Sequence, residues 1–282
     1  MQPVARRSCL TVPGSSEKML AKALALPADE IVLDLEDSVA AAAKGDARER
    51  VAKLLAGDEW RRRRVAVRIN AIGSAWWEDD VRAVIAAGHP LLSLVVPKVE
   101  SATALAELDA RLGDAPAGVQ ALIESATGLA YAREIAAARG RLETVILGYA
   151  DLAASLGRPA DSVQPWLFAQ ETLLLAARAH GLEAIDGPFF AIADADGLAR
   201  SASTARQLGF DGKWAIHPGQ ISVLNATFTP SETEVGRARA LVAALDRASA
   251  HGQGAASFEG GMIDEAMRAP AMRTLARAGT SI

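Results

Sequence analysis

The chain has 282 residues, half of them hydrophobic, and a net charge of −4 from 30 Lys plus Arg and 34 Asp plus Glu. That length suits one barrel-sized domain or two smaller ones, and this charge gives no indication of a nucleic-acid or anionic-membrane partner. The single cysteine, Cys9, excludes a disulfide framework. Neither a long apolar segment nor a signal-peptide pattern is present, so we expect a soluble, cytoplasmic protein.

Short apolar runs alternate with Ala-rich helical stretches along most of the chain. We expect strands at residues 8–12, 30–35, 65–69, 92–96, 119–123, 144–147, 184–189 and 213–216. Helices are expected between them, for example at residues 17–26, 102–112, 130–138, 165–179 and 197–208. Eight strands separated by helices predict an α/β protein with a parallel sheet, and the number eight favours a closed (β/α)₈ TIM barrel. An open, doubly wound sheet is the alternative.

Charged side chains stand where most of these predicted strands end. In chain order they are Glu36, Asp37, Arg68, Lys98, Glu124 and Asp151. Because the active site of a barrel lies at the carboxyl ends of its strands, we expect these side chains to share one mouth.

Glu124 and Asp151 end two consecutive predicted strands and would face the same mouth. Two such carboxylates can hold one Mg²⁺, which keeps several waters and accepts substrate oxygens. The main chain of residues 148–150 (Gly148, Tyr149 and Ala150) would add N–H donors for substrate oxyanions, because glycine permits close approach. Two alternatives remain: Glu124 could form a salt bridge at the barrel end, and Asp151 could cap a helix that begins at Leu152.

The last part of the chain differs from the rest. We expect residues 1–250 to form the barrel domain and residues 251–282 to form a C-terminal extension. The extension contains a glycine-rich segment, residues 251–261, which we interpret as a flexible tether, and then a final helical stretch to about residue 278. A tethered helix is typical of a lid, or of an arm that reaches a neighbouring subunit. A surface appendage without function is the alternative.

Several short motifs occur in an order that is specific to one family. They are LTVPGS at 10–15, LDLEDS at 33–38, VRIN at 67–70, VPK at 96–98, LIES at 122–125, GYAD at 148–151, AIHP at 215–218 and EGGMID at 259–264. With these motifs the chain resembles the citrate lyase β-subunit-like family of the HpcH/HpaI aldolase superfamily. The resemblance implies a (β/α)₈ barrel, bound Mg²⁺, a C-terminal lid and a homotrimer or homohexamer in which the lid reaches a neighbouring subunit. It also implies making or breaking a carbon–carbon bond between a 2-oxoacid and an acyl-CoA.

The resemblance also implies roles for particular residues. The family's metal ligands correspond to Glu124 and Asp151. Its arginine for the substrate carboxylate corresponds to Arg68, and the lid aspartate, which enters a neighbouring subunit's site, corresponds to Asp264.

Further matches and two departures concern other positions. Glu36 and Asp37 match an acidic pair that supports the arginine and the metal-bound waters. Ala150 stands where the family often has Glu, which affects substrate choice. Ala266 stands where the lid motif usually has Pro, and here the proline comes later, at Pro270.

From these features we expect a Mg²⁺-dependent carbon–carbon lyase. Its substrate would be a 3-hydroxyacyl-CoA of the citramalyl-CoA or malyl-CoA type, and its products acetyl-CoA and pyruvate or glyoxylate. Asp264 would move a proton to or from the acetyl methyl carbon when the lid closes. The alternatives are the β subunit of a citrate lyase complex acting on a carrier-bound citryl thioester, a CoA-independent metal aldolase, a Schiff-base aldolase using Lys98, and a non-catalytic oxoacid-binding protein.

Overall fold

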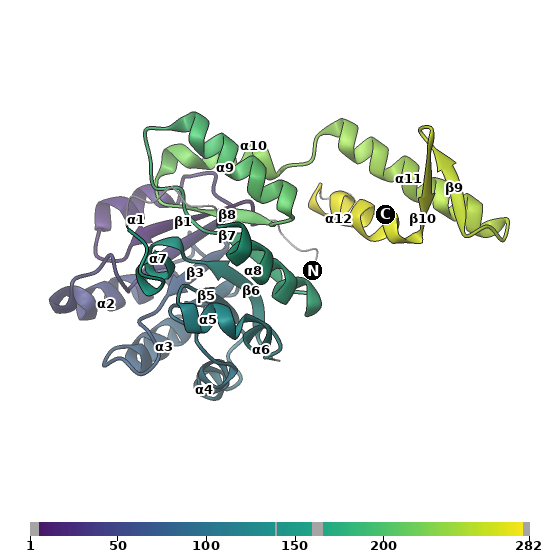
Figure 1. Cartoon of the computed structure of the whole chain (residues 1–282). Helices are drawn as coiled ribbons and strands as arrows, with labels where there is room; N and C mark the ends of the chain where they lie inside the picture. Colours follow the sequence, from purple (N-terminus) through teal and green to yellow (C-terminus); the bar gives the residue numbers. More distant parts are fainter. Residues whose placement is uncertain (1–5, 139, 160–165, 279–282) are drawn as a thin grey trace. The chain divides into compact units, whose positions relative to one another are not determined.

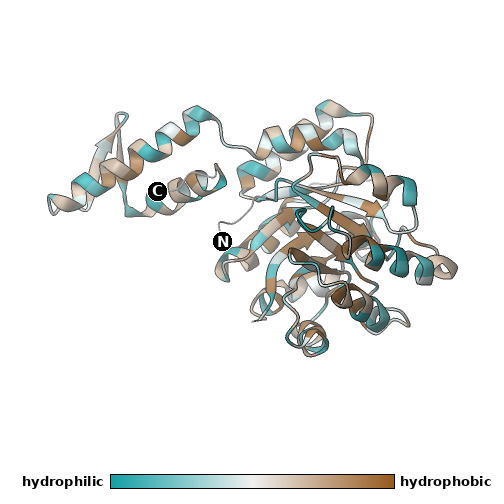
Figure 2. Cartoon of the chain, turned by 180° about the vertical axis from the view of Figure 1, so that it is seen from behind, coloured by the Kyte–Doolittle hydropathy of each residue, from teal (hydrophilic) through white to brown (hydrophobic). Residues whose placement is uncertain are grey.

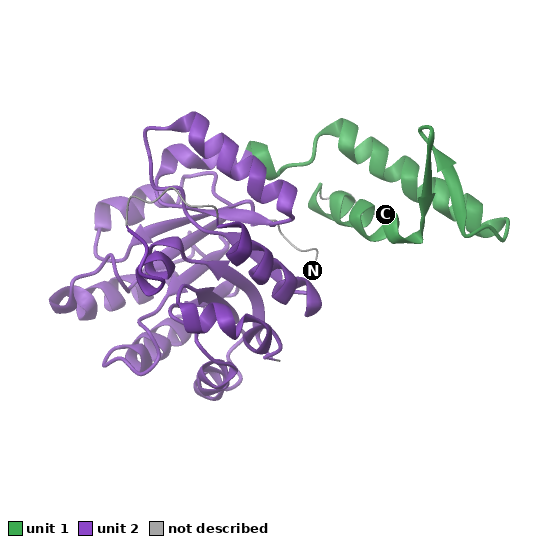
Figure 3. Ribbon diagram, in the orientation of Figure 1, with its two compact units in different colours: residues 1–5, 226–282 green, residues 6–225 purple. Residues whose placement is uncertain are grey.

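The computed structural model describes residues 6–138, 140–159 and 166–278. These residues form two compact units, which divide between residues 225 and 226 (Figure 3). The predicted domain boundary at residue 250 stays a prediction. Among the described helices, none combines the length and the apolarity that crossing a membrane requires.

The larger unit is a closed barrel of eight parallel strands, in which β8 pairs with β1 (Figure 1). The strands are β1 (Ser8–Pro13), β2 (Glu30–Asp34), β3 (Val65–Arg68), β4 (Leu92–Val96), β5 (Gly118–Ile123), β6 (Leu142–Leu147), β7 (Glu183–Asp186) and β8 (Gly212–Ala215). The predicted (β/α)₈ barrel is therefore confirmed, and the open sheet is wrong. The seventh strand is shorter than predicted because Pro188, which lacks an N–H, cannot extend a sheet ladder.

Helices connect the strands on the outside of the barrel. They are α1 (Glu17–Ala23), η1 (Ala41–Ala43), α2 (Lys44–Leu55), α3 (Trp77–Ala86), α4 (Ala102–Leu112), α5 (Ala126–Ala130), α6 (Ala132–Ala136), α7 (Tyr149–Ser155), α8 (Leu167–Ala179), α9 (Ala195–Leu208), η2 (Pro218–Gln220) and α10 (Ile221–Phe228). Side-chain caps at Ser16, Ser101, Ser125 and Asp194 start four of them. The helix predicted at 130–138 is the shorter α6, and α5 forms a separate helix before it. Residue 165, where we expected another helix to begin, lies outside the described residues.

The middle of the barrel is filled by one apolar layer, with one residue from each strand. It consists of Cys9, Val32, Ala66, Val95, Leu122, Ile146, Ile185 and Trp214, all buried, and the strands are correspondingly brown in Figure 2. Side chains alternate along a strand, so residues two positions further on point into the barrel again. Toward the carboxyl ends, this alternation brings Asp34, Arg68 and Glu124 to the barrel mouth.

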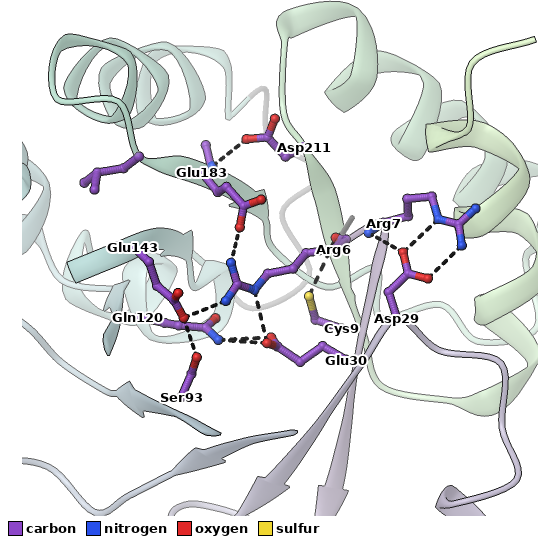
Figure 4. Close-up of polar contacts among 12 residues, drawn as sticks. Arg6, Arg7, Cys9, Asp29, Glu30, Ser93, Gln120, Glu143, Glu183 and Asp211 are labelled. Carbon is purple, nitrogen blue, oxygen red and sulfur yellow. Dashed lines mark hydrogen bonds and ion pairs between the residues drawn. The ribbon is translucent and has the colours of Figure 1, made fainter. Parts of the chain in front are cut away.

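Polar side chains close the opposite end of the barrel (Figure 4). The buried guanidinium of Arg6 lies 3.1 Å from Oε1 of Glu30 and 2.6 Å from Oε1 of Glu143, and it also pairs with Glu183. The amide of Gln120 donates to both carboxylate oxygens of Glu30, each at 3.1 Å. One buried cation thus joins carboxylates from three strands at the amino-terminal end of the barrel.

The smaller unit contains α11 (Glu232–Ala250), β9 (Ala255–Phe258), β10 (Gly261–Asp264), η3 (Glu265–Met267) and α12 (Arg268–Arg277). We expected a flexible tether at 251–261, but β9 and β10 form an antiparallel hairpin whose turn contains Glu259 and Gly260 at positive φ. Ile263 of the hairpin is buried against Ala244 and Leu245 of α11. The predicted last helix begins only at Arg268, because the residues before it are paired in β10 or belong to η3.

Candidate active site

A cavity of about 200 Å³ opens at the carboxyl ends of the barrel strands. Of the predicted site residues, it is lined by Asp37, Arg68, Glu124, Gly148, Tyr149, Ala150 and Asp151. Side chains that the sequence analysis did not single out line the rest. They are Thr11 and six apolar residues, Leu122, Leu147, Pro188, Phe190, Trp214 and Ile216. The cavity therefore has a charged part and an apolar part.

Glu124 follows β5 directly and is buried. The main-chain N–H of Lys98 donates to its Oε1 over 2.9 Å, and a Cβ on Gly148 would lie only 2.6 Å from its Oε2. The N–H of Lys98 and the main chain of Gly148 thus contact the carboxylate of Glu124 on two sides. Burial, together with the charges of Asp151 and Glu36, raises the pKa of Glu124 to about 8.

Asp151 lies in the first turn of α7, whose N-cap is Gly148. It is half-buried and lines the cavity, and its charge is one cause of the raised pKa of Glu124. The alternative that Asp151 itself caps a helix starting at Leu152 is wrong, because α7 begins at Tyr149, three residues before Leu152. A carboxylate in a first turn is still favoured by the helix dipole.

Arg68, the last residue of β3, is held by two carboxylates. Its Nε and Nη2 donate to the two oxygens of Asp34, each at 2.7 Å, and its Nη1 lies 3.0 Å from Oε2 of Glu36. Burial alone would raise the pKa of Asp34, but its hydrogen bonds from Arg68 hold that pKa below its ordinary value. The sequence analysis missed Asp34; the only signal was an acid between Leu33 and Leu35, directly after the apolar run 31–33.

Lys98 lies just beyond β4 and adopts a positive φ of 52°. Its Nζ is 2.5 Å from Oε1 of Glu36 and 3.7 Å from Oδ1 of Asp37. Burial would lower the pKa of this ammonium, but its ion pair with Glu36 raises the pKa above its ordinary value. A Schiff-base mechanism needs a neutral amine, so this environment argues against that alternative for Lys98.

The segment 148–150 does not supply all the predicted donors. The N–H of Gly148 bonds to the carbonyl of Ile123 over 3.0 Å, so its prediction as an oxyanion donor is wrong. The N–H groups of Tyr149 and Ala150 belong to the first turn of α7 and have no intrahelical partner. The Tyr149 hydroxyl donates to buried Asp186, which also pairs with Lys213.

Asp264 ends β10 in the smaller unit, where its Oδ1 accepts a hydrogen bond from the N–H of Ala266 over 3.0 Å. It caps η3 and is half-buried. Its part in the barrel site stays a prediction.

The charges around the cavity suit a divalent cation. Five carboxylates stand near two cations, Arg68 and Lys98: Asp34, Glu36, Asp37, Glu124 and Asp151. Within residues 6–138, 140–159 and 166–278, no three His, Cys, Asp or Glu side chains are grouped to hold a metal. Mg²⁺ needs only one or two protein carboxylates and completes its shell with water and substrate, so a pair of acids at this cavity is enough in number.

Comparison with known proteins decides the family. Residues 7–218 match the sequence profile of the HpcH/HpaI aldolase/citrate lyase family. The chain belongs to this family. The family predicted from the motifs is thereby confirmed, and this HpcH/HpaI protein is a carbon–carbon lyase by membership.

Relatives of this HpcH/HpaI protein occur among characterised enzymes. It is 38% identical over 279 residues to an L-malyl-CoA/β-methylmalyl-CoA lyase of Cereibacter sphaeroides, a match that covers 89% of this chain and 88% of the relative. It is 40% identical over 276 residues to a (3S)-malyl-CoA thioesterase of the same species, with 96% of this chain and 94% of the relative covered.

Solved structures of this family have the same fold. CitE of Mycobacterium tuberculosis, in complex with magnesium, acetoacetate and coenzyme A, is 35% identical with a TM-score of 0.80, covering 99% of this chain and 100% of that chain. A citrate lyase of Burkholderia xenovorans LB400 is 26% identical with a TM-score of 0.84, covering 100% of this chain and 94% of that chain.

Proposed function

We propose that this protein cleaves a 3-hydroxyacyl-CoA of the malyl-CoA or citramalyl-CoA type into acetyl-CoA and glyoxylate or pyruvate, with Mg²⁺ as cofactor. The observation that carries the proposal is the placement of Glu124 and Asp151 on one cavity together with Arg68. The similarity to a malyl-CoA lyase and to a magnesium- and CoA-bound CitE supports both the substrate class and the metal.

Glu124 and Asp151 would hold the Mg²⁺. The fit rests on their chemistry: Glu124 is a buried carboxyl whose pKa is raised to about 8 by burial and by neighbouring acids, and a divalent cation would offset that negative charge. When bound, Mg²⁺ lowers the pKa of a substrate hydroxyl and polarises an adjacent carbonyl.

Arg68 would bind the carboxylate of the oxoacid. Its planar, permanently charged guanidinium suits bidentate recognition of a carboxylate. Asp34 fixes the plane of this guanidinium through two hydrogen bonds, and Glu36 holds its remaining terminal nitrogen. Because the arginine is already oriented, little side-chain entropy is lost when the substrate binds.

The apolar wall, which includes Leu147, Trp214 and Ile216, would contact the carbon skeleton of the substrate and exclude water. For proton transfer at the acetyl methyl carbon we assign Asp264, delivered by a lid of the C-terminal unit. As the resemblance implies, that lid would serve a neighbouring subunit in a trimer or hexamer.

A second candidate function is hydrolysis of the same thioester. The match to a (3S)-malyl-CoA thioesterase has 40% identity and covers 96% of this chain, somewhat more than the match to the lyase. The thioesterase reaction adds water to the thioester carbonyl and releases a 3-hydroxy acid and free CoA thiol. The carbon–carbon bond stays intact, so the products distinguish the two activities.

The test is incubation of the purified protein with malyl-CoA, β-methylmalyl-CoA and citramalyl-CoA, with and without Mg²⁺. Mg²⁺-dependent formation of an oxoacid, together with acetyl-CoA from malyl-CoA or citramalyl-CoA and propionyl-CoA from β-methylmalyl-CoA, supports the lyase. Thiol release without oxoacid supports the thioesterase. Glu124→Gln and Asp151→Asn should each lower turnover about 100-fold or more while leaving the unfolding temperature near that of the wild type. Turnover of free CoA thioesters would also argue against an obligatory carrier protein.

A further inference from the structure

Lys98 has an unusual backbone conformation at the edge of the site. Its φ is 52°, and within the described part of the chain Glu259 is the only other non-glycine residue with a positive φ. Side chains rarely tolerate this left-handed region, and such strain gathers at functional sites. A glycine would adopt this conformation freely, yet the chain has a lysine at position 98.

The main chain at this position reaches across to the next strand. The N–H of Lys98 donates to Oε1 of Glu124 over 2.9 Å, and the N–H of Val99 donates to the carbonyl of Leu122 over 3.2 Å. The conformation of Lys98 therefore occupies one oxygen of Glu124 and leaves the other, Oε2, for a ligand.

The side chain of Lys98 reaches the end of a different strand. Its Nζ lies 2.5 Å from Oε1 of Glu36, whose other oxygen lies 3.0 Å from Nη1 of Arg68. Glu36 is buried, and each of its two oxygens faces one cation. These two ion pairs fix the carboxylate of Glu36 on the side of Arg68.

Glu36 and Glu124 nevertheless contact the same residue, Glu36 through the Nζ of Lys98 at 2.5 Å and Glu124 through its main-chain N–H at 2.9 Å. A divalent cation held by Glu124 would attract Glu36 as well. A third carboxylate would tighten cation binding, but it would also fill a coordination position that the substrate oxygens need.

We propose that Lys98 is a positioning residue that keeps Glu36 out of the coordination shell of the cation held by Glu124 and Asp151. This role rests on the proposed function, because it requires a divalent cation at those two residues. Lys98 thereby keeps coordination positions open for the substrate, and it keeps Glu36 available to orient Arg68.

The test compares the wild type with Lys98→Met, which keeps the aliphatic stem but removes the charge. Mn²⁺ is used in place of Mg²⁺, and water-proton relaxation reports how many waters the bound ion retains. In Lys98→Met we expect about one water fewer, roughly three- to tenfold tighter binding and about 10- to 100-fold lower kcat. Tighter binding of the cation with slower turnover is not what a general loss of structure produces.

Three further variants separate charge from conformation. Lys98→Arg keeps the ion pair and should retain the wild-type number of waters, whereas Lys98→Gly keeps only the N–H and should behave like Lys98→Met. The double variant Lys98→Met/Glu36→Gln should recover the lost water, because a neutral amide is a poorer ligand.

Lys53→Met is the control for the loss of one positive charge. It removes a lysine from an exposed position on α2 and should change neither the number of waters nor the affinity for Mn²⁺.

Failure of the proposed function and failure of the role of Lys98 give different results. If the wild type binds no Mn²⁺, or binds it equally well without Glu124 and Asp151, the proposed function fails and the role of Lys98 fails with it. If the wild type binds Mn²⁺ at these residues but neither Lys98→Met nor Lys98→Gly loses a water, only the role of Lys98 is overturned. A tighter binding constant with an unchanged number of waters is a through-space charge effect and also overturns it.

Discussion

Gly148 and Glu124 touch across neighbouring strands: a Cβ at position 148 would lie 2.6 Å from both Cβ and Oε2 of Glu124. The φ of Gly148 is −104°, which any residue adopts, so an alanine there is opposed by this contact and not by the backbone. We expect Gly148→Ala to displace the Glu124 carboxylate and to lower the affinity for Mg²⁺ at least about tenfold. Isothermal titration calorimetry of the metal-free protein measures this directly.

A matched glycine is available as a control. Gly45 lies in α2, and a Cβ there would meet nothing within 4 Å. Gly45→Ala should leave Mg²⁺ binding unchanged and stabilise the fold by about 0.5–1 kcal/mol. Equal Mg²⁺ affinities of Gly148→Ala and the wild type would show that Glu124 is not held by this contact.

The affinity for Mg²⁺ should depend on pH through Glu124. Its pKa is raised to about 8, and a metal ligand must be deprotonated, so a proton competes with the cation below that pH. We expect the dissociation constant to fall up to about tenfold per pH unit between pH 6 and 8 and to level off above about pH 8. An affinity that is constant from pH 6 to 9 contradicts this assignment.

The same carboxyl should affect the stability of the metal-free protein with a definite sign. A raised pKa means that the folded state holds the proton more tightly than the unfolded state does. This contribution is fully present below the unfolded value of about 4.3 and is lost as the pH rises toward about 8. Glu124→Gln should remove that slope from a plot of unfolding free energy against pH.

Asp34→Asn should loosen Arg68 while the barrel stays intact. The two hydrogen bonds of 2.7 Å from Arg68 become one good bond at most, because the amide nitrogen of asparagine cannot accept. We expect KM for the thioester to rise about tenfold or more, with a smaller effect on Mg²⁺ affinity. If kcat changed and KM stayed at the wild-type value, Arg68 would not act by binding the thioester substrate.

The pH dependence of stability offers a second readout for this pair. The pKa of Asp34 is lowered in the folded state, so its ionised form contributes stability above the unfolded pKa of about 3.9. That contribution is lost as the pH falls through the folded pKa. The unfolding midpoints of the wild type and Asp34→Asn should therefore differ at pH 7 and converge in acid.

The barrel was predictable because its signals are local. Each strand is a short apolar run, each is followed by a helical pattern, and residues such as Glu124 and Asp151 stand out at the ends of such runs. The pairing of Asp34 with Arg68 was not predictable, since it joins side chains 34 residues apart and depends on their sharing one face of adjacent strands. The alternation of side chains shows which residues share a face, but only the register between β2 and β3 shows that Asp34 lies opposite Arg68.

The C-terminal hairpin shows a different limit of sequence reasoning. Glycines at 252, 254, 260 and 261 indicated flexibility, yet two of them, Gly252 and Gly260, occupy turns with positive φ. What makes the segment regular is the burial of Ile263 against α11, a tertiary contact that local composition does not reveal. Glycine content excluded a helix correctly but did not exclude a hairpin.

Asp264→Asn tests the proposed proton carrier. The amide keeps an oxygen that can accept from the N–H of Ala266, so the cap of η3 and the local fold should persist. If Asp264 moves a proton in the reaction, kcat should fall about 100-fold or more, while binding of the oxoacid and Mg²⁺ changes little. Hydrogen exchange of the acetyl-CoA methyl group should fall in parallel. Turnover at the wild-type rate would remove Asp264 from the mechanism.

Arg6→Met tests the closed base of the barrel. The guanidinium is buried beside Glu30, Glu143 and Glu183, and removing it leaves the fully buried Glu30 and two partly exposed glutamates without this cation. We expect the free energy of unfolding to fall by about 3–5 kcal/mol in urea at pH 7, because breaking a buried pair costs more than the pair contributed. Arg82→Met, which removes an exposed pair with Asp79, should have no measurable effect.

The pH dependence of this variant follows from its glutamates. Burial raises the pKa of Glu183 even with Arg6 present, and without Arg6 that pKa should rise further. Protonated glutamates need no cation, so the stability deficit of Arg6→Met should shrink as the pH falls from 7 toward 5. Mg²⁺ affinity should stay at the wild-type value, because the cavity lies at the carboxyl ends of the strands and Arg6 lies at the other end. A loss of Mg²⁺ binding without a loss of stability would instead mean that the base of the barrel controls the geometry of the site.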